Sequence, residues 1–224
     1  MYRIGIIDDN LFEVDDIQAT IYTVWTKHND APNEVDFKHY ELSSSPSFKD
    51  ELLKELLYDI KNSIIQSLII DYKLDSLRTV LEGKDIVDFL RDQVPFFPVI
   101  ILTNAPQGSK AEEKIDPDKV YDKRSFFDLN STKSYEMAFN IFLNIKRYIN
   151  RRNELEQNLA AALNELTTRA GADVDISLIS QISKIEEELS DYTITGQSYA
   201  ERAFDLSELR ELINELQAIG NSEE

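Results

Sequence analysis

Polar side chains that could do chemistry lie at or just past the ends of four short apolar runs. These side chains are Asp8-Asp9, Asp71, Thr103 and Lys123. If the runs are parallel strands, their carboxyl ends lie at one edge of a sheet, which brings the four features together. Three carboxylates repel one another unless a hard cation lies among them, and Mg²⁺ is the oxygen-preferring ion usually found beside phosphoryl groups. Thr103 could donate a hydrogen bond to a phosphoryl group and Lys123 could supply a positive charge, so these residue types predict a Mg²⁺-dependent phosphoryl site.

The elements that must position this site alternate along residues 2–122. Short β-branched runs are separated by amphipathic stretches of helical length, a pattern typical of βα repeats wound into a doubly wound parallel α/β sheet. The apolar runs LII and VIIL indicate central strands buried on both faces. The expected strands are Arg3–Ile7, Glu34–Tyr40, Ser67–Ile70, Phe97–Leu102 and Lys119–Tyr121, and the expected helices are 11–28, 47–62, 84–92, 109–115 and 132 onward.

The last part of the chain is predicted to be helical throughout. No proline or glycine occurs from Ser131 to Arg169, so the fifth helix should leave the sheet as a stalk of roughly four heptads, ending near Gly171. Two further amphipathic helices are expected, around 176–189 and 206–219. We expect a boundary that divides the chain into residues 1–150 and 151–224, with self-association through residues 141–166. The apolar stripe consists of Ile141, Ile145, Tyr148, Leu155, Leu159, Ala162 and Leu166.

Composition excludes several classes of site and partner. The 224 residues contain no cysteine and only His28 and His39, which excludes thiolate chemistry and argues against a histidine metal cluster, so any metal should be held by oxygen. The formal net charge of -18 argues against binding to nucleic acid. Because no segment reaches the ~20 apolar residues of a membrane span, we expect a cytoplasmic protein without membrane contact.

Four segments together resemble a known family. IGIIDDN, LIIDYKLD, VIILTNA and VYDKR, in this order, are similar to the strand ends of bacterial response-regulator receiver domains, and the resemblance covers residues 1–150. Residues 1–150 are similar in particular to the single-domain chemotaxis regulators. The resemblance implies a flavodoxin-like five-stranded sheet of order 2-1-3-4-5. The helices beyond residue 150 resemble no output domain that we recognise.

The resemblance also assigns roles to the strand-end residues. It implies that Asp71 is the phosphoacceptor, receiving the phosphoryl group from a histidine kinase or phosphotransfer protein, while Thr103 and Lys123 hold the phosphoryl oxygens. Such a protein is a phosphoacceptor with possible self-phosphotransfer and autodephosphorylation, not a classical enzyme. The implied protein ligands of Mg²⁺ are Asp8, partly through water, Asp9, Asp71 and the backbone carbonyl of Lys73.

Some residues depart from the family pattern. Asn104 follows Thr103 where the family has a very small residue, and Arg124 follows the lysine where proline is common. Val120 takes the place where the family often has a switch aromatic, and Tyr121 comes one position later. These departures bear on the lifetime of the phosphoryl group and on its coupling to the helices.

Other interpretations remain open at this point. The carboxylates Glu13, Asp15 and Asp16 are interpreted as the charged outer face of the first helix, in preference to extra metal ligands. The main hypothesis is a receiver that relays phosphorylation through its helical extension, by dimerisation or by partner binding. The alternatives are an adaptor that works without phosphorylation and a phosphate sink without an output of its own.

Overall fold

The computed structural model describes residues 1–28, 34–43, 45, 47–74, 82–104, 106, 115–168 and 176–194. All of them belong to one compact unit, Met1–Ile194. The helices expected at 109–115 and 206–219, apart from residue 115, lie outside the described residues. The helix end expected at Gly171 and residues 75–81 also lie outside them.

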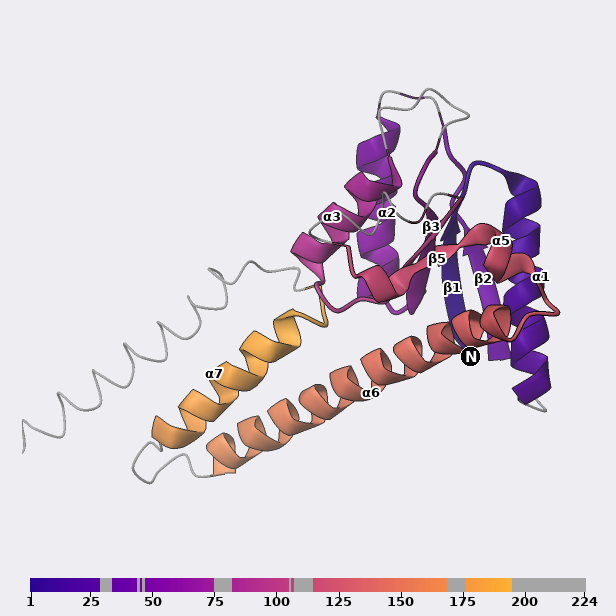
Figure 1. Ribbon diagram of the computed structural model, residues 1–224. Coiled ribbons are helices and arrows are strands. Elements are labelled where there is room, and N and C mark those ends of the chain that lie inside the picture. Colours follow the sequence, from indigo (N-terminus) through magenta and orange to yellow (C-terminus); the bar gives the residue numbers. More distant parts are fainter. Residues whose placement is uncertain are drawn as a thin grey trace, which may run out of the picture. The chain divides into compact units, whose positions relative to one another are not determined.

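A five-stranded parallel sheet forms the centre of the fold (Figure 1). All four strand pairs are parallel, and the strand order is β2-β1-β3-β4-β5. This is the flavodoxin-like order, so the predicted fold class is confirmed. The apolar runs LII and VIIL lie in buried parts of β3 and β4, as expected for central strands. The strands are β1 Tyr2–Ile7, β2 Val35–His39, β3 Ser67–Asp71, β4 Val99–Thr103 and β5 Val120–Asp122.

Helices cover both faces of this sheet. Apolar residues of α2 and α3 pack on one face, and those of α1, α5 and α6 pack on the other. The short helix α5 was not predicted, and it begins where the carboxylate of Asp122 accepts a hydrogen bond from the backbone N–H of Ser125. The described helices are α1 Leu11–His28, α2 Phe48–Lys61, α3 Gly83–Gln93, α5 Lys123–Phe127, α6 Thr132–Thr168 and α7 Ile176–Ser190, with a 3₁₀ turn, η2, at Pro117–Lys119.

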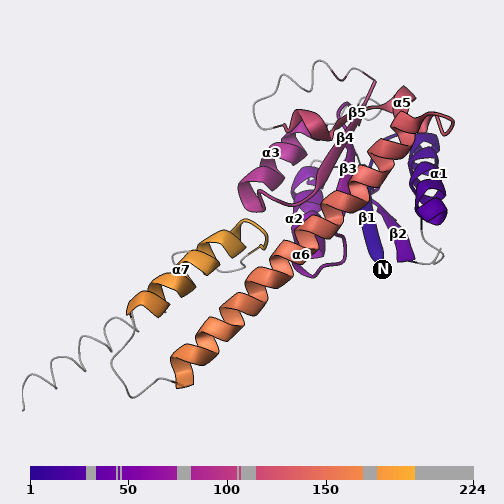
Figure 2. The ribbon, with the colours of Figure 1, turned by 60° about the horizontal axis from the view of Figure 1, so that its bottom comes forward.

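Helix α6 is the predicted long helix, and α7 runs alongside its second half (Figure 2). In its first half, Ile141 and Ile145 are fully buried against the sheet and α1. In its second half, Leu159, Ala162 and Leu166 pack with Leu178 and Ile182 of α7. The predicted long helix is confirmed, and α7 folds back on its distal half, a point that the sequence left open. Self-association through residues 141–166 would require α7 to leave, because α7 already buries the distal part of the stripe.

The segment after α7 returns to the sheet unit. The backbone N–H of Phe96 donates to the carbonyl of Asp191 at 3.1 Å, and the ring of Tyr192 stacks on Phe96 with centroids 4.9 Å apart. The hydroxyl of Tyr148, on α6, donates to the carbonyl of Tyr192 at 2.7 Å. These contacts hold the end of α7 between α6 and the loop that precedes β4.

The boundary expected at residue 150 falls inside α6, which continues through it. A division of the chain into 1–150 and 151–224 stays a prediction. Among the described helices, none combines the length and the apolar character that crossing a membrane requires.

Candidate phosphoryl site

The carboxyl edge of the sheet brings the predicted strand-end residues to one place. Asp8 follows β1, Asp71 ends β3, Thr103 ends β4 and Lys123 follows β5. Of these, Asp8, Thr103 and Lys123 are only 1–2% exposed. Burial of charged and polar groups is costly unless each has a partner, so their arrangement must satisfy them locally.

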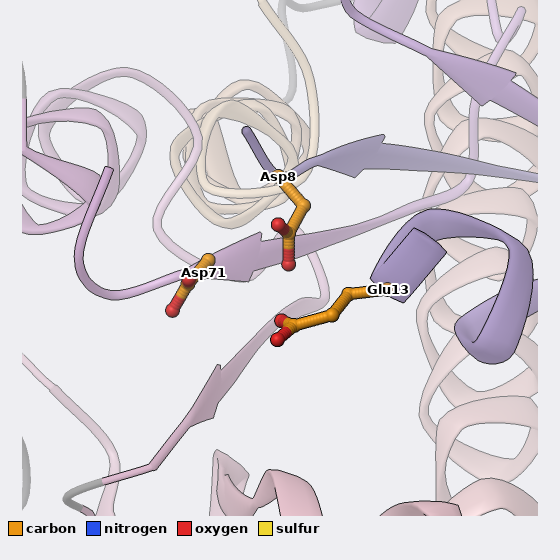
Figure 3. A group of neighbouring side chains, drawn as sticks. All are labelled: Asp8, Glu13 and Asp71. Carbon is orange, nitrogen blue, oxygen red and sulfur yellow. The ribbon is translucent and has the colours of Figure 1, made fainter. Parts of the chain in front are cut away.

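The ammonium of Lys123 lies among three carboxylates. Its Nζ is 2.9 Å from Oδ2 of Asp8 and 2.8 Å from Oδ2 of Asp71, and it also donates to Oε2 of Glu13. In Figure 3 the carboxylates of Asp8 and Glu13 converge, and the side chain of Asp71 lies beside them at the end of β3. An ammonium has three N–H donors, so each donor has one carboxylate as its acceptor.

Burial and charge act against each other in this group. Burial raises the pKa of Asp71 to about 6, although the hydrogen bond and the charge of Lys123 oppose the rise. Burial likewise raises the pKa of Asp8, again against Lys123. Burial disfavours the charged form of Lys123, but the hydrogen bonds to Asp71, Glu13 and Asp8 outweigh it and raise the pKa of its ammonium. The lysine therefore stays charged, while both aspartates ionise less readily than in water.

Glu13 is a site residue that the sequence interpretation missed. Asn10 places it, because the side chain of Asn10 accepts from the N–H of Phe12 and its carbonyl accepts from the N–H of Glu13 at 2.9 Å. The N–H of Asn10 in turn donates to Oδ1 of Asp8 at 2.9 Å. These bonds tie the first turn of α1 to the end of β1, and Glu13 then points at the site. A carboxylate in the first turn after a strand-end aspartate was the available signal.

The other acidic residues of this region behave differently. Asp15 and Asp16 are exposed, as expected for the outer face of α1. Among the described residues, the group whose carboxylate oxygens lie within 4.8 Å of one another consists of Asp8, Glu13 and Asp71, without Asp9. The N–H of Lys73 donates to Oδ1 of Asp71 at 3.3 Å, which places this residue beside the acceptor. Metal ligation by Asp9 and by the carbonyl of Lys73 stays a prediction.

The donor set fits a hard divalent cation. Asp8, Glu13 and Asp71 offer only oxygen atoms, which Mg²⁺ prefers. When the three carboxylates are ionised and Lys123 is charged, the group carries a net charge of about -2, which a divalent cation would neutralise. The chain therefore has an acidic cluster suited to Mg²⁺ at the edge where the sequence predicted it.

Backbone packing sets the position of Asp71. The first residue of α3, Gly83, lies so close that an added Cβ would be 2.2 Å from the carbonyl oxygen of Asp71. Glu82 and Asp85 form a capping box that begins α3 at this point. Only glycine allows α3 to begin this close to the end of β3.

The residues that depart from the family pattern directly follow Thr103 and Lys123 or belong to β5. Asn104 and Arg124 are exposed. Val120 is buried with the residues of α2 and α3, whereas Tyr121 is buried on the opposite face, where its ring stacks on Phe126 with centroids 6.4 Å apart. Tyr121 is thus part of the core between the sheet, α1 and α6.

Comparisons with known proteins find little. No family model and no curated protein matches the chain. Among solved structures, the chain is similar to the RcsB response regulator of Salmonella typhimurium, with 14% identity, 87% of this chain and 93% of that chain covered, and a TM-score of 0.41. Because identity and TM-score are both low, we assign the fold from the strand order alone.

Proposed function

We propose that this chain is a response-regulator receiver in which Asp71 accepts a phosphoryl group from a phosphohistidine of a kinase or phosphotransfer protein. The observation that carries the proposal is the position of Lys123. Its ammonium bridges Asp71 and Asp8 at the carboxyl edge of a sheet of order 2-1-3-4-5, 2.8 Å and 2.9 Å from their oxygens.

The residues of the site have separate tasks in this reaction. A carboxylate oxygen of Asp71 attacks the phosphorus, an acyl phosphate bond forms, and the bond from phosphorus to the donor imidazole breaks. With a pKa of about 6, Asp71 is mostly ionised at pH 7 and is ready to attack. Lys123, already 2.8 Å from the acceptor oxygen, donates to the phosphoryl oxygens, and Thr103 at the end of β4 supplies a hydroxyl donor.

Mg²⁺ is the proposed cofactor, and Asp8, Asp71 and their neighbours would hold it. When bound, it neutralises the charge that gathers on the transferring phosphoryl group. Direct ligation by Asp9 and by the carbonyl of Lys73 belongs to this proposal.

The helices beyond residue 150 are proposed to relay the state of the site to a partner. Support comes from their attachment, because α6 packs on the sheet and Tyr192 stacks on the loop before β4. A shift of this loop or of the sheet face would therefore reach α7. Partner binding by the rearranged helices is favoured over direct dimerisation, because α7 covers the stripe that a dimer would use.

The test is Mg²⁺-dependent labelling by a small phosphodonor. Purified chain is incubated with acetyl phosphate and Mg²⁺, and covalent phosphate is followed by intact-mass spectrometry. We expect label on the wild type and on Asp16→Asn, a matched control on the exposed face of α1. No label is expected on Asp71→Ala or after EDTA is added.

Equal labelling of the wild type and Asp71→Ala, or no label on either, would contradict the proposal. An unlabelled chain whose partner binding survives Asp71→Asn would indicate an adaptor that works without phosphorylation. A labelled chain whose partner binding never responds to label would indicate a phosphate sink.

A further inference from the structure

Lys123 has a third partner that the phosphoryl reaction does not require. Glu13 accepts from the same ammonium as Asp8 and Asp71, and its oxygens lie within 4.8 Å of theirs. The three carboxylates use all three N–H donors of the lysine. Lys123 can donate to a phosphoryl oxygen only when one of them releases it.

Exposure indicates which carboxylate is released. The side chain of Asp8 is 0% exposed, that of Asp71 is 14% exposed and that of Glu13 is 26% exposed. A buried carboxylate that loses its cation stays without a partner, whereas a carboxylate open to solvent is rehydrated. Phosphorylation converts the Asp71 carboxylate into an acyl phosphate, so Asp8 and Glu13 remain to compete with the phosphoryl oxygens for Lys123, and Glu13 is the more exposed of the two.

We infer that Glu13 is a positioning residue that holds Lys123 in the unphosphorylated protein and competes with the phosphoryl group for its ammonium. This inference rests on the proposed function, because it concerns the acceptor state of Asp71. Glu13 lowers the affinity of the site for a phosphoryl group in two ways, by occupying Lys123 and by placing a like charge beside the phosphoryl oxygens. The same charge raises the affinity of the site for Mg²⁺.

Replacement of Glu13 by glutamine separates charge from shape. Glu13→Gln keeps the length of the side chain and removes its charge. Binding of Mg²⁺ alone should weaken, since the cluster loses one of three negative charges. Binding of beryllofluoride, a phosphoryl mimic, should tighten at saturating Mg²⁺, because a neutral amide holds Lys123 less tightly than a carboxylate does and the repulsion is gone. Opposite changes in the two affinities are the signature, since a loosened site would bind both ligands less well.

The experiment measures both affinities on the full chain. Mg²⁺ alone is titrated by calorimetry, and beryllofluoride is titrated at saturating Mg²⁺ by ¹⁹F NMR. For Glu13→Gln we expect about tenfold weaker Mg²⁺ binding and about tenfold tighter beryllofluoride binding, each corresponding to about 1.4 kcal/mol. The control Asp16→Asn removes the same charge from an exposed position on the same helix and should leave both affinities within about twofold of the wild type.

The measured affinities test the role of Glu13 separately from the proposed function. If Glu13→Gln does not weaken Mg²⁺ binding and tighten beryllofluoride binding together, or if Asp16→Asn shows the same pattern, the inference is overturned while the proposed function stands. If the wild type does not bind beryllofluoride in the presence of Mg²⁺, the proposed function fails and this inference fails with it.

Discussion

Replacement of Asp71 by asparagine should make the protein more stable at neutral pH in the absence of metal. The carboxylate of Asp71 is held in an environment that disfavours its charge, because burial outweighs the help that Lys123 supplies. Asparagine has nearly the same shape and carries no charge. Lys123 keeps Asp8 and Glu13 as partners in this variant, so its ammonium stays paired.

The size of the effect follows from the pKa of Asp71. Folding raises this pKa from 3.8 to about 6. One pKa unit corresponds to about 1.4 kcal/mol, so the ionised group lowers the free energy of unfolding by about 3 kcal/mol at pH 7. For a chain of this length the gain in Asp71→Asn corresponds to a rise in Tm of roughly 6–12 °C.

The free energy of unfolding of the wild type should fall as the pH rises, because of Asp71. Well below pH 3.8, folded and unfolded chains both keep the proton of Asp71, and the group has no effect on stability. As the pH rises from 3.8 to about 6, the unfolded chain loses the proton first and the folded chain keeps it. The wild type therefore loses about 3 kcal/mol of stability over this window through Asp71, and Asp71→Asn does not.

Urea unfolding in EDTA-containing buffer between pH 4 and pH 7 measures this difference, with Asp16→Asn as the control for a surface charge. The reasoning is refuted if Asp71→Asn is no more stable than the wild type at pH 7, or if its advantage is as large at pH 4 as at pH 7. Added Mg²⁺ should stabilise the wild type and narrow the gap, because the cation binds only the folded site.

Three further substitutions test the packing around the site and the helices. Gly83→Ala places a Cβ 2.2 Å from the carbonyl oxygen of Asp71, so we expect a loss of about 3 kcal/mol in urea unfolding together with loss of phosphodonor labelling. Asp59→Ala removes the buried carboxylate of α2 that accepts from the hydroxyl of Tyr40 at 2.6 Å and also pairs with Lys38, and should cost about 2 kcal/mol in the same assay because the buried hydroxyl loses its partner. Tyr192→Ala removes the ring that stacks on the sheet unit, and amide exchange throughout α7 should become about tenfold faster or more by mass spectrometry.

Controls for these variants come from exposed positions of the same elements. Asp92→Ala on α3 and Lys61→Ala on α2 should change the free energy of unfolding by no more than about 0.5 kcal/mol. Ile176→Ala, at the 79% exposed start of α7, should leave amide exchange in α7 near the wild-type rate. A Gly83→Ala variant as stable as the wild type would mean that α3 can move away from β3. Unchanged exchange in Tyr192→Ala would mean that packing on α6 alone holds α7.

Much of the candidate site could be predicted from strand ends. The apolar runs before Asp8, Asp71 and Thr103 are short and β-branched, and parallel pairing brings their carboxyl ends to one edge whatever the surrounding sequence. The strand bounds differ from prediction by one or two residues, as for β2, which is Val35–His39 and was expected at 34–40. These differences do not move the site, because each of its residues is the last residue of a strand or lies just past one.

Glu13 could not be found by the same reasoning. Helix periodicity assigns a residue to a face, and by that measure Glu13 resembles its exposed neighbours Asp15 and Asp16. Its contact with Lys123 spans 110 positions in the sequence. It depends on the turn at Asn10, which directs the start of α1 toward the strand ends. The five-residue helix α5 was missed for a related reason, since it is too short to show a period.

The sequence by itself determined the alternation of strands and helices, the residue types at the strand ends and the length of α6, because these follow from apolar periods and from residue types at fixed places. Only the tertiary structure decided what covers the stripe of α6 and which carboxylates surround Lys123. An amphipathic stripe specifies that it must be buried without specifying the partner, and Leu178 and Ile182 of the same chain bury its distal half. Likewise, a lysine after β5 can pair with any carboxylate at the sheet edge, and the first turn of α1 selects Glu13.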